Sequence, residues 1–186
     1  MSHYGSYQEM HSWYLTLPDP VMDRIHLAGF GDFMTVISNV QRSTYVFQAF
    51  TERWWATTNT FHLGFGKMTI TSLDFSMLTG LRCGGPAIPL YGNIHQRPAA
   101  IARCLGDRFA ASAILSERVF CLALREFFHG YVCETIEDID ILAQAFILHL
   151  LGSCLLSNVD NTVHLGFLRA LEDLNQITRY DWEALP

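Results

Sequence analysis

Lysine is almost absent from this sequence. The 186 residues include one lysine, Lys67, and eleven arginines that are scattered singly, and the formal net charge is -6. Non-specific binding of nucleic acids depends on lysine and arginine side chains that neutralise phosphates. The composition therefore argues against a nucleic-acid-binding groove, although an arginine patch assembled by folding stays open.

Charged residues of both signs are also scarce. They make up 16% of the chain, whereas 50% of the residues are apolar; an ordinary soluble domain carries roughly 25% charged residues. This balance excludes disorder over most of the chain. It predicts a large core, or a surface that a partner covers. The length suits one compact domain, which we place at residues 18–186, preceded by an N-terminal arm at residues 1–17.

Motifs for secretion and for metal binding are missing. The first residues contain no basic segment followed by an apolar run, so we expect no signal peptide. The five cysteines form no C-x-x-C pair, and His129 with Cys133 would supply only two ligands. We therefore expect reduced cysteines, no metal site and no cofactor. His149 lies on an apolar helix face and is expected to be a hydrogen-bonded core histidine.

One segment is apolar enough to suggest a membrane span. It is "IDILAQAFILHLLGSCLL", residues 139–156. A span needs about 20 apolar residues with few charges. This segment is shorter and contains Asp140, Gln144 and His149, so a buried core helix is the better interpretation and we expect no membrane partner.

Apolar residues recur at helical spacing through most of the chain, which predicts a mainly α-helical fold. Thr71 with Asp74, and Thr135 with Asp138, have the spacing of capping pairs and indicate helix starts. The predicted helices cover residues 19–28, 31–38, 43–55, 72–79, 97–106, 116–129, 136–151 and 163–175.

The stretch "ERWWATTNTFHLGFGKMTIT", residues 52–71, departs from the helical pattern. Two short extended runs, near 61–63 and 67–71, are separated by G-F-G. Gly64 and Gly66 permit the positive φ that a tight hairpin needs. The predicted fold is thus mainly α, a single compact helical domain with one small β-hairpin near residues 61–71.

The tryptophan pair precedes this hairpin. Val46, Phe50 and Trp54 recur every four residues along the helix predicted over 43–55. We therefore expect Trp54 to be buried, with Phe61 and Met68 closing over it. Asn59 and His62 carry side chains suited to binding turn and strand-end backbone groups, and we expect them to do so.

Known catalytic motifs do not fit. The glycines of "GFGK" are two apart, whereas a phosphate-binding loop needs G-x-x-x-x-G-K-[ST]. No G-x-S-x-G nucleophile motif occurs. One alternative stays open, an enzymatic or nucleic-acid-processing site assembled from His62, Asp74 and Cys83. It requires these three side chains to converge in one cleft.

The same stretch, extended as "ERWWATTNTFHLGFGKMTITSLDFSMLTGL", resembles the signature of the plant mobile domain family. "LHLLGSCLLS" and "LEDLNQITRYDW" resemble two later segments of that family, so the similarity covers roughly residues 20–183. We expect a structural role for the signature residues Arg53, Trp54, Asn59, Phe61, His62, Phe65, Gly66, Met68, Thr69, Thr71 and Asp74.

Three departures from the family pattern bear on function. Lys67 replaces the usual glutamate, "LRCGG" replaces L-P-V-D-G, and the sequence stops soon after Trp182, where the family continues into an apolar helix. We expect a domain truncated at its C-terminus, with an apolar face for a partner or second copy. The family's "aminotransferase-like" label implies a lysine Schiff base. Lys67 is the only candidate for that lysine, and it stands where the family usually carries glutamate, so we set that chemistry aside.

The resemblance implies a nuclear, non-catalytic protein-interaction module linked to transposable-element silencing, genome stability and meristem maintenance, or a transposon-encoded copy of one. It also implies a phosphatase-like protein partner of the plant type-7 class. Self-association is a further expectation, and the cytoplasm is the second choice of location.

The charge balance leads to a test of nucleic-acid binding. With a net charge of -6 and one lysine, the purified protein is expected to bind duplex DNA no better than weakly at physiological salt. Fluorescence anisotropy of a labelled duplex, measured over a range of salt concentrations, checks this. Sub-micromolar, salt-sensitive binding would contradict it.

Overall fold

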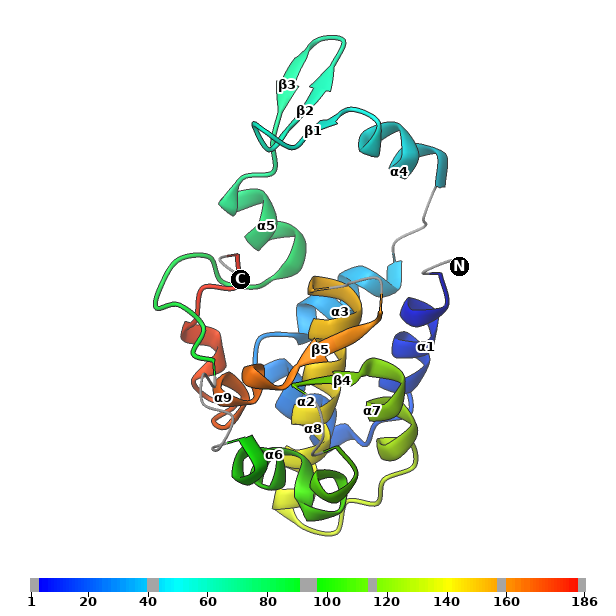
Figure 1. Cartoon of the computed structure of the whole chain (residues 1–186), viewed down its shortest axis with the longest axis vertical. Coiled ribbons are helices and arrows are strands. Elements are labelled where there is room, and N and C mark those ends of the chain that lie inside the picture. Colours follow the sequence, from blue (N-terminus) through cyan, green and yellow to red (C-terminus); the bar gives the residue numbers. More distant parts are fainter. Residues whose placement is uncertain (1–3, 40–43, 91–96, 114–116, 157–159, 184–186) are drawn as a thin grey trace.

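The computed structural model describes residues 4–39, 44–90, 97–113, 117–156 and 160–183, and it confirms a mainly helical fold (Figure 1). The helices are α1 Tyr4–Tyr14, α2 Asp19–Leu27, α3 Gly31–Asn39, α4 Thr44–Thr51, α5 Ser72–Thr79, α6 Arg97–Ala113, α7 Cys121–Phe128, α8 Ile136–Leu150 and α9 Leu168–Leu171. The strands are β1 Trp54–Trp55, β2 Thr60–Leu63, β3 Gly66–Met68, β4 Arg118–Phe120 and β5 Thr162–His164.

Helix α8 is the centre of the core. Residues 142–150 are all buried, and α2, α6, α7 and α9 pack around them. The helix begins at the predicted capping pair: Thr135 accepts a hydrogen bond from the Asp138 amide, and the Asp138 carboxylate accepts one from the Thr135 amide. Within the described residues, one helix, Ile136–Leu155, has the length and apolar composition of a membrane span, but 67% of that window is buried inside the protein. Such burial fits the predicted core helix.

Tight packing shapes the end of α8. Residues Leu151–Leu155 widen into a π-type turn, and Gly152 lies directly against α7 and β5. A Cβ atom at Gly152 would stand 2.5 Å from Cys121 Sγ and 2.7 Å from Val163 Cβ. Only glycine lets these three elements approach so closely.

A second small sheet corrects the prediction of a single hairpin. β4 and β5 pair antiparallel, with Val119 opposite Val163. These strands replace the beginnings of the helices predicted over 116–129 and 163–175; residue 116 lies outside the described residues. Pairing between segments more than 40 residues apart outweighs the local helical pattern.

The predicted N-terminal arm contributes to the core. Residues 4–14 form α1, and Met10, Trp13 and Leu17 are buried. The Trp13 ring lies edge-on to Phe146 of α8, with ring centroids 5.2 Å apart. In the described part of residues 1–17, the chain therefore packs as one unit with the helices that follow.

The irregular segment after α5 is held by the C-terminal residues. Trp182 is buried against Phe30, with ring centroids 5.1 Å apart, and its indole Nε1 donates to the Ile177 carbonyl at 3.1 Å. The Trp182 amide donates to the Arg82 carbonyl at 3.0 Å. The bond to Arg82 fixes the loop predicted from "LRCGGP", within the described residues 81–90.

His149 is the hydrogen-bonded core histidine that its position predicted. It is 3% exposed, and its Nδ1 donates to the Cys121 carbonyl at 2.8 Å, because a carbonyl can only accept. Burial lowers the pKa of His149 to about 4, from 6.5. A proton on this ring would place a charge inside the core.

The free energy of unfolding is therefore expected to depend on His149 in mild acid. The pKa is lower in the folded chain than in the unfolded chain, so the stabilisation is complete above pH 6.5. It is expected to fall by on the order of 3 kcal/mol as the pH drops to about 4. Urea titrations at a series of pH values check this. His149→Gln should flatten this interval, and the exposed control His129→Gln should leave the slope unchanged.

Candidate functional site

A segment that extends away from the helical core is the most distinctive surface of the molecule. Residues 44–80, here called the protrusion, contain α4, the sheet β1–β2–β3 and α5. Figure 1 shows α4 and the sheet at the far end, with α5 returning towards α3. The protrusion holds the signature stretch, residues 52–81, up to Gly80, and Leu81 after it is buried in the core.

Large apolar side chains are exposed throughout the protrusion. None of the side chains that the structure describes between residues 45 and 80 is buried. Phe65 is 82% exposed and Met77 76%. The full exposed set is Tyr45, Val46, Phe50, Trp54, Trp55, Phe65, Met68, Ile70, Leu73, Met77 and Leu78. A monomer in water gains nothing from such a surface, so its position suggests contact with another molecule.

One face of the small sheet carries a row of aromatic and apolar side chains. Register places Trp54 opposite Phe61, and Phe61 opposite Met68. The Phe61 ring contacts Trp54 at 4.8 Å and Phe50 of α4 at 5.3 Å, centroid to centroid. This row is the only packing that joins α4 to the sheet among the aromatic contacts of the described residues.

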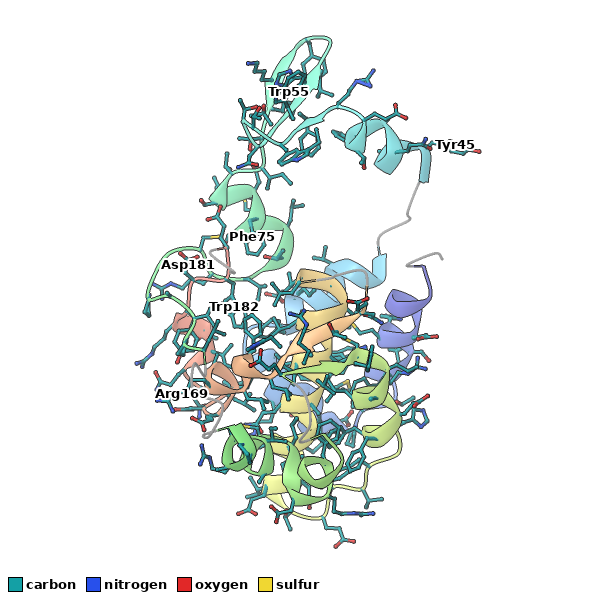
Figure 2. All side chains as sticks on the ribbon, in the orientation of Figure 1. Tyr45, Trp55, Phe75, Arg169, Asp181 and Trp182 are labelled. Carbon is teal, nitrogen blue, oxygen red and sulfur yellow. The ribbon has the colours of Figure 1, made fainter. Side chains whose placement is uncertain are left out.

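The opposite face carries Trp55 and His62. Their rings are stacked, with centroids 4.9 Å apart and planes 9° from parallel. His62 Nε2 is shielded from solvent and has no hydrogen-bond partner among the residues that the structure describes. Trp55 remains 55% exposed, and Figure 2 shows it at the end of the protrusion that is farthest from the core.

The prediction that Trp54 is buried in a helix is wrong. Helix α4 ends at Thr51, and Trp54 stands in β1 with 42% of its surface exposed. The cause is strand pairing: the His62 amide donates to the Arg53 carbonyl at 2.8 Å. Because Arg53 pairs with β2 through this bond, the helix ends before Trp54 and Trp55. Of the two expected neighbours, Phe61 lies beside Trp54, whereas Met68 lies on β3, on the far side of Phe61.

The predicted hairpin and its following helix are confirmed, but the second strand, predicted over 67–71, spans Gly66–Met68. Leu63 pairs with Gly66, so the turn is Gly64–Phe65. Gly66 has a φ of 147°, whereas Gly64 is outside the positive-φ region. Helix α5 begins at Ser72, as predicted, behind a capping box of Thr71 and Asp74.

Several polar signature residues bond to each other or to nearby backbone. Asn59 adopts a left-handed φ of 49°, and its carbonyl accepts a hydrogen bond from Thr69 Oγ1 at 2.8 Å. In the described residues, the side chains of Asn59 and His62 make none of the backbone hydrogen bonds expected of them. The Asn59 and His62 side chains were expected to satisfy backbone groups at the turn and strand ends. The hydrogen bond from the Thr69 hydroxyl to the Asn59 carbonyl satisfies one such group and ties the end of the hairpin to the turn before it.

All eleven signature residues thus lie in the protrusion, and the structure gives each a position. They are Arg53 before β1, Trp54 in β1, Asn59 in the turn, Phe61 and His62 in β2, Phe65 at the hairpin tip, Gly66 and Met68 in β3, Thr69 after β3, and the cap residues Thr71 and Asp74.

Helix α5 anchors the protrusion to the core. Phe75 packs against the core, and Gly80 ends the helix with a φ of 72°. A Cβ atom at Gly80 would stand 2.9 Å from Asp32 Cβ on α3, so the two helices meet closely there. Leu73, Met77 and Leu78 point elsewhere and are exposed.

The apolar pattern of the helix over residues 72–79 already indicated an exposed apolar surface, although we predicted only the helix from it. A surface helix normally has one apolar stripe. In "SLDFSMLTG", apolar residues surround the helix, so a helix docked by Phe75 must expose the others. Tyr45, Trp55 and Ile70 were likewise missed as surface residues.

The protrusion is electrically neutral. It contains Glu52 and Asp74 against Arg53 and Lys67. The remaining sixteen acidic and ten basic residues lie elsewhere, so the formal charge of -6 belongs to the rest of the chain. An apolar, neutral surface favours a protein partner over a phosphate backbone.

The alternative catalytic set does not form a hydrogen-bonded group. Among the described residues, no hydrogen bond joins His62, Asp74 and Cys83. Hydrogen bonds from Thr71 lower the pKa of Asp74, which is committed to capping α5. Cys83 Sγ donates to the Ser72 carbonyl at 3.0 Å, and desolvation together with nearby carboxylates raises its pKa. A raised pKa keeps the thiol protonated and unreactive.

Other potential sites are weak. No group of three or more metal-binding side chains occurs among the described residues. A cavity of about 340 Å³ is lined by Arg118, Thr162 and His164, with apolar neighbours. Its arginine Nε donates to Thr162 Oγ1 at 2.9 Å, and His164 Nδ1 accepts from the Gly166 amide at 2.9 Å. These polar groups therefore hold the loop structure itself.

Comparisons with known proteins point to one family. The model of the plant mobile domain matches residues 29–185. Among proteins of Arabidopsis thaliana, Protein MAINTENANCE OF MERISTEMS is 26% identical over 179 residues, and Protein MAIN-LIKE 1 is 31% identical over 184 residues. Each alignment covers 94% of this chain.

A third relative from the same plant is the Serine/threonine-protein phosphatase 7 long form homolog, which is 30% identical over 149 residues, or 78% of this chain. The chain spans about a third of the length of the first two relatives, 36% and 35%, and 11% of the third. No solved structure matches it.

The two turn glycines provide a matched test of the hairpin. A Cβ atom at Gly64 or at Gly66 would have no neighbour within 4 Å, so only the φ of 147° at Gly66 separates them. Gly66→Val is expected to destabilise the hairpin by about 1–2 kcal/mol, and Gly64→Val much less. Hydrogen exchange of the Phe61 and Leu63 amides, whose residues pair with Met68 and Gly66 across the hairpin, measures local opening. Equal exchange in both variants would contradict the turn assignment.

Proposed function

This chain belongs to the plant mobile domain family, and we propose that it acts as a non-catalytic protein-interaction module in the nucleus. The name of one relative points to meristem maintenance, and the family resemblance points to transposable-element silencing and genome stability. The observation that carries the proposal is the apolar, neutral protrusion built from the signature stretch.

The composition of the protrusion supports protein binding. Interface cores are depleted in charge and enriched in tryptophan, tyrosine, phenylalanine and methionine. Residues 45–77 expose two tryptophans, two phenylalanines, a tyrosine and two methionines. Tryptophan and tyrosine are enriched among the few residues that supply most of the binding energy at known interfaces.

The cysteines support a reducing location such as the nucleus. All five are free, and burial raises the pKa of Cys104 and of Cys121 to about 12. Disulfides persist mainly in oxidising compartments. Free, protonated thiols in the core therefore agree with a nuclear protein, with the cytoplasm as the second choice.

A phosphatase-like protein of the type-7 class is the proposed partner. One relative carries that name, and its sequence contains a segment similar to this chain. We propose that this chain binds such a protein through the protrusion. The interaction role and the identity of the partner are independent parts of the proposal. A partner of another class would leave the interaction role intact.

The proposal is tested by the binding of the purified chain to the Arabidopsis type-7 phosphatase homologue, measured by biolayer interferometry. The double variant Leu73→Ser/Met77→Ser removes side chains that are 68% and 76% exposed on α5. It is expected to weaken binding at least tenfold, since each tenfold corresponds to about 1.4 kcal/mol.

The matched control is Val132→Ser/Ile136→Ser, whose side chains are 71% and 69% exposed outside the protrusion. It should leave binding unchanged. Circular dichroism of all variants confirms that they fold. Equal binding by both double variants would refute the protrusion as the interface. A fluorescent fusion that is excluded from plant nuclei would refute the location.

A further inference from the structure

We propose that two copies of this chain associate through their protrusions, each covering exposed apolar side chains of the other. This inference deepens the proposed function, because it assigns a specific partner to the same surface. It concerns the purified chain alone and does not require the phosphatase-like protein.

The first argument is the amount of apolar surface. If a large aromatic side chain has about 150–250 Å² of surface, the exposed parts of the eleven apolar side chains of the protrusion sum to on the order of 1,000 Å². These side chains lie on more than one face of the protrusion, so a single contact covers part of this area. A stable interface buries about 800 Å² per partner, polar atoms included. The apolar area of the protrusion is therefore of the size that a dimer interface needs.

The second argument is charge. Two copies with a net charge of -6 each would repel if their acidic parts met. The protrusion has two acidic and two basic residues, so contact between two protrusions brings neutral surfaces together and keeps the acidic cores apart. A two-fold axis through such a self-complementary patch gives the commonest kind of oligomer.

The third argument is that the described residues of the chain do not cover this surface. Figure 2 places Tyr45 and Trp55 at the end of the protrusion away from the core, while Phe75 faces the core at its base. Anchoring of α5 at Gly80 against Asp32 holds this arrangement. The outer apolar side chains are thus presented to solvent, where a second copy offers a surface of matching chemistry.

The contact is expected to use side-chain faces rather than the sheet edge. β1 and β3 are the two edge strands of the sheet, and β1 has two residues, too few for extended pairing with another strand. β3 pairs with β2 on its other side. It carries Lys67, and a charged residue on an edge strand disfavours further strand pairing. The aromatic row of Trp54, Phe65 at the hairpin tip and the exposed side chains of α5 are therefore the contacting elements.

The single lysine makes the proposal directly testable. An amine-reactive cross-linker can join Lys67 to Lys67 only between two molecules, because no second lysine exists. Sedimentation velocity of the wild-type chain should show a concentration-dependent dimer, and mass spectrometry of the cross-linked dimer should identify the Lys67–Lys67 link. Phe65→Ser/Met77→Ser should weaken the dimer at least tenfold and lose the link. Val132→Ser/Ile136→Ser should keep both.

Three results would overturn the inference: a wild-type chain that stays monomeric at all concentrations, a dimer without the Lys67 link, or a dimer that only the control variant disrupts. If circular dichroism shows that the Phe65→Ser/Met77→Ser variant is unfolded, the presence or absence of the Lys67–Lys67 link in the wild-type dimer decides whether the inference stands. A monomer that binds the phosphatase-like protein through the protrusion would overturn self-association and leave the proposed function standing.

Discussion

Burial of α8 on all sides is the constraint on which the core depends. Nine consecutive residues of this helix are buried, including Gln144 and His149. Buried polar groups are costly unless they are hydrogen-bonded. Gln144 Nε2 donates to the Leu171 carbonyl at 2.8 Å, and His149 donates to the Cys121 carbonyl. These two bonds therefore fix α9 and α7 against the central helix, and Gly152 lets β5 approach its end.

Because the core closes around α8 without the protrusion, the two parts of the chain serve different purposes. The core buries its apolar residues and accounts for the fold. The protrusion keeps its own apolar residues exposed, stabilised by cross-strand contacts, a capping box and its anchor on α3. The longest segment that carries the family resemblance and the exposed apolar surface coincide in the protrusion, which is why the interaction proposal is placed there. The acidic charge remains on the core, away from the surface proposed for contact.

Local features of the fold could be predicted because each depends on residues a few positions apart. The capping boxes at Thr71 and Thr135, the turn at Gly66 and the start of α5 are of this kind. The β4–β5 pair could not be predicted, since its two strands are short and far apart in the sequence. Trp54 was misplaced for the same reason: a bond between Arg53 and His62, nine residues on, overrode the helical spacing.

The sequence by itself determined the mainly helical class, the central apolar helix, the hairpin and the family, because periodicity, caps and an ordered motif are properties of the chain alone. Only the tertiary structure decided which apolar residues are covered. The residue type shows that Trp54, Met77 or Phe146 is apolar, and the spacing places each of them on one side of its element. Whether that side meets the core depends on the path of the chain through space, and in the protrusion that path leads away from the core.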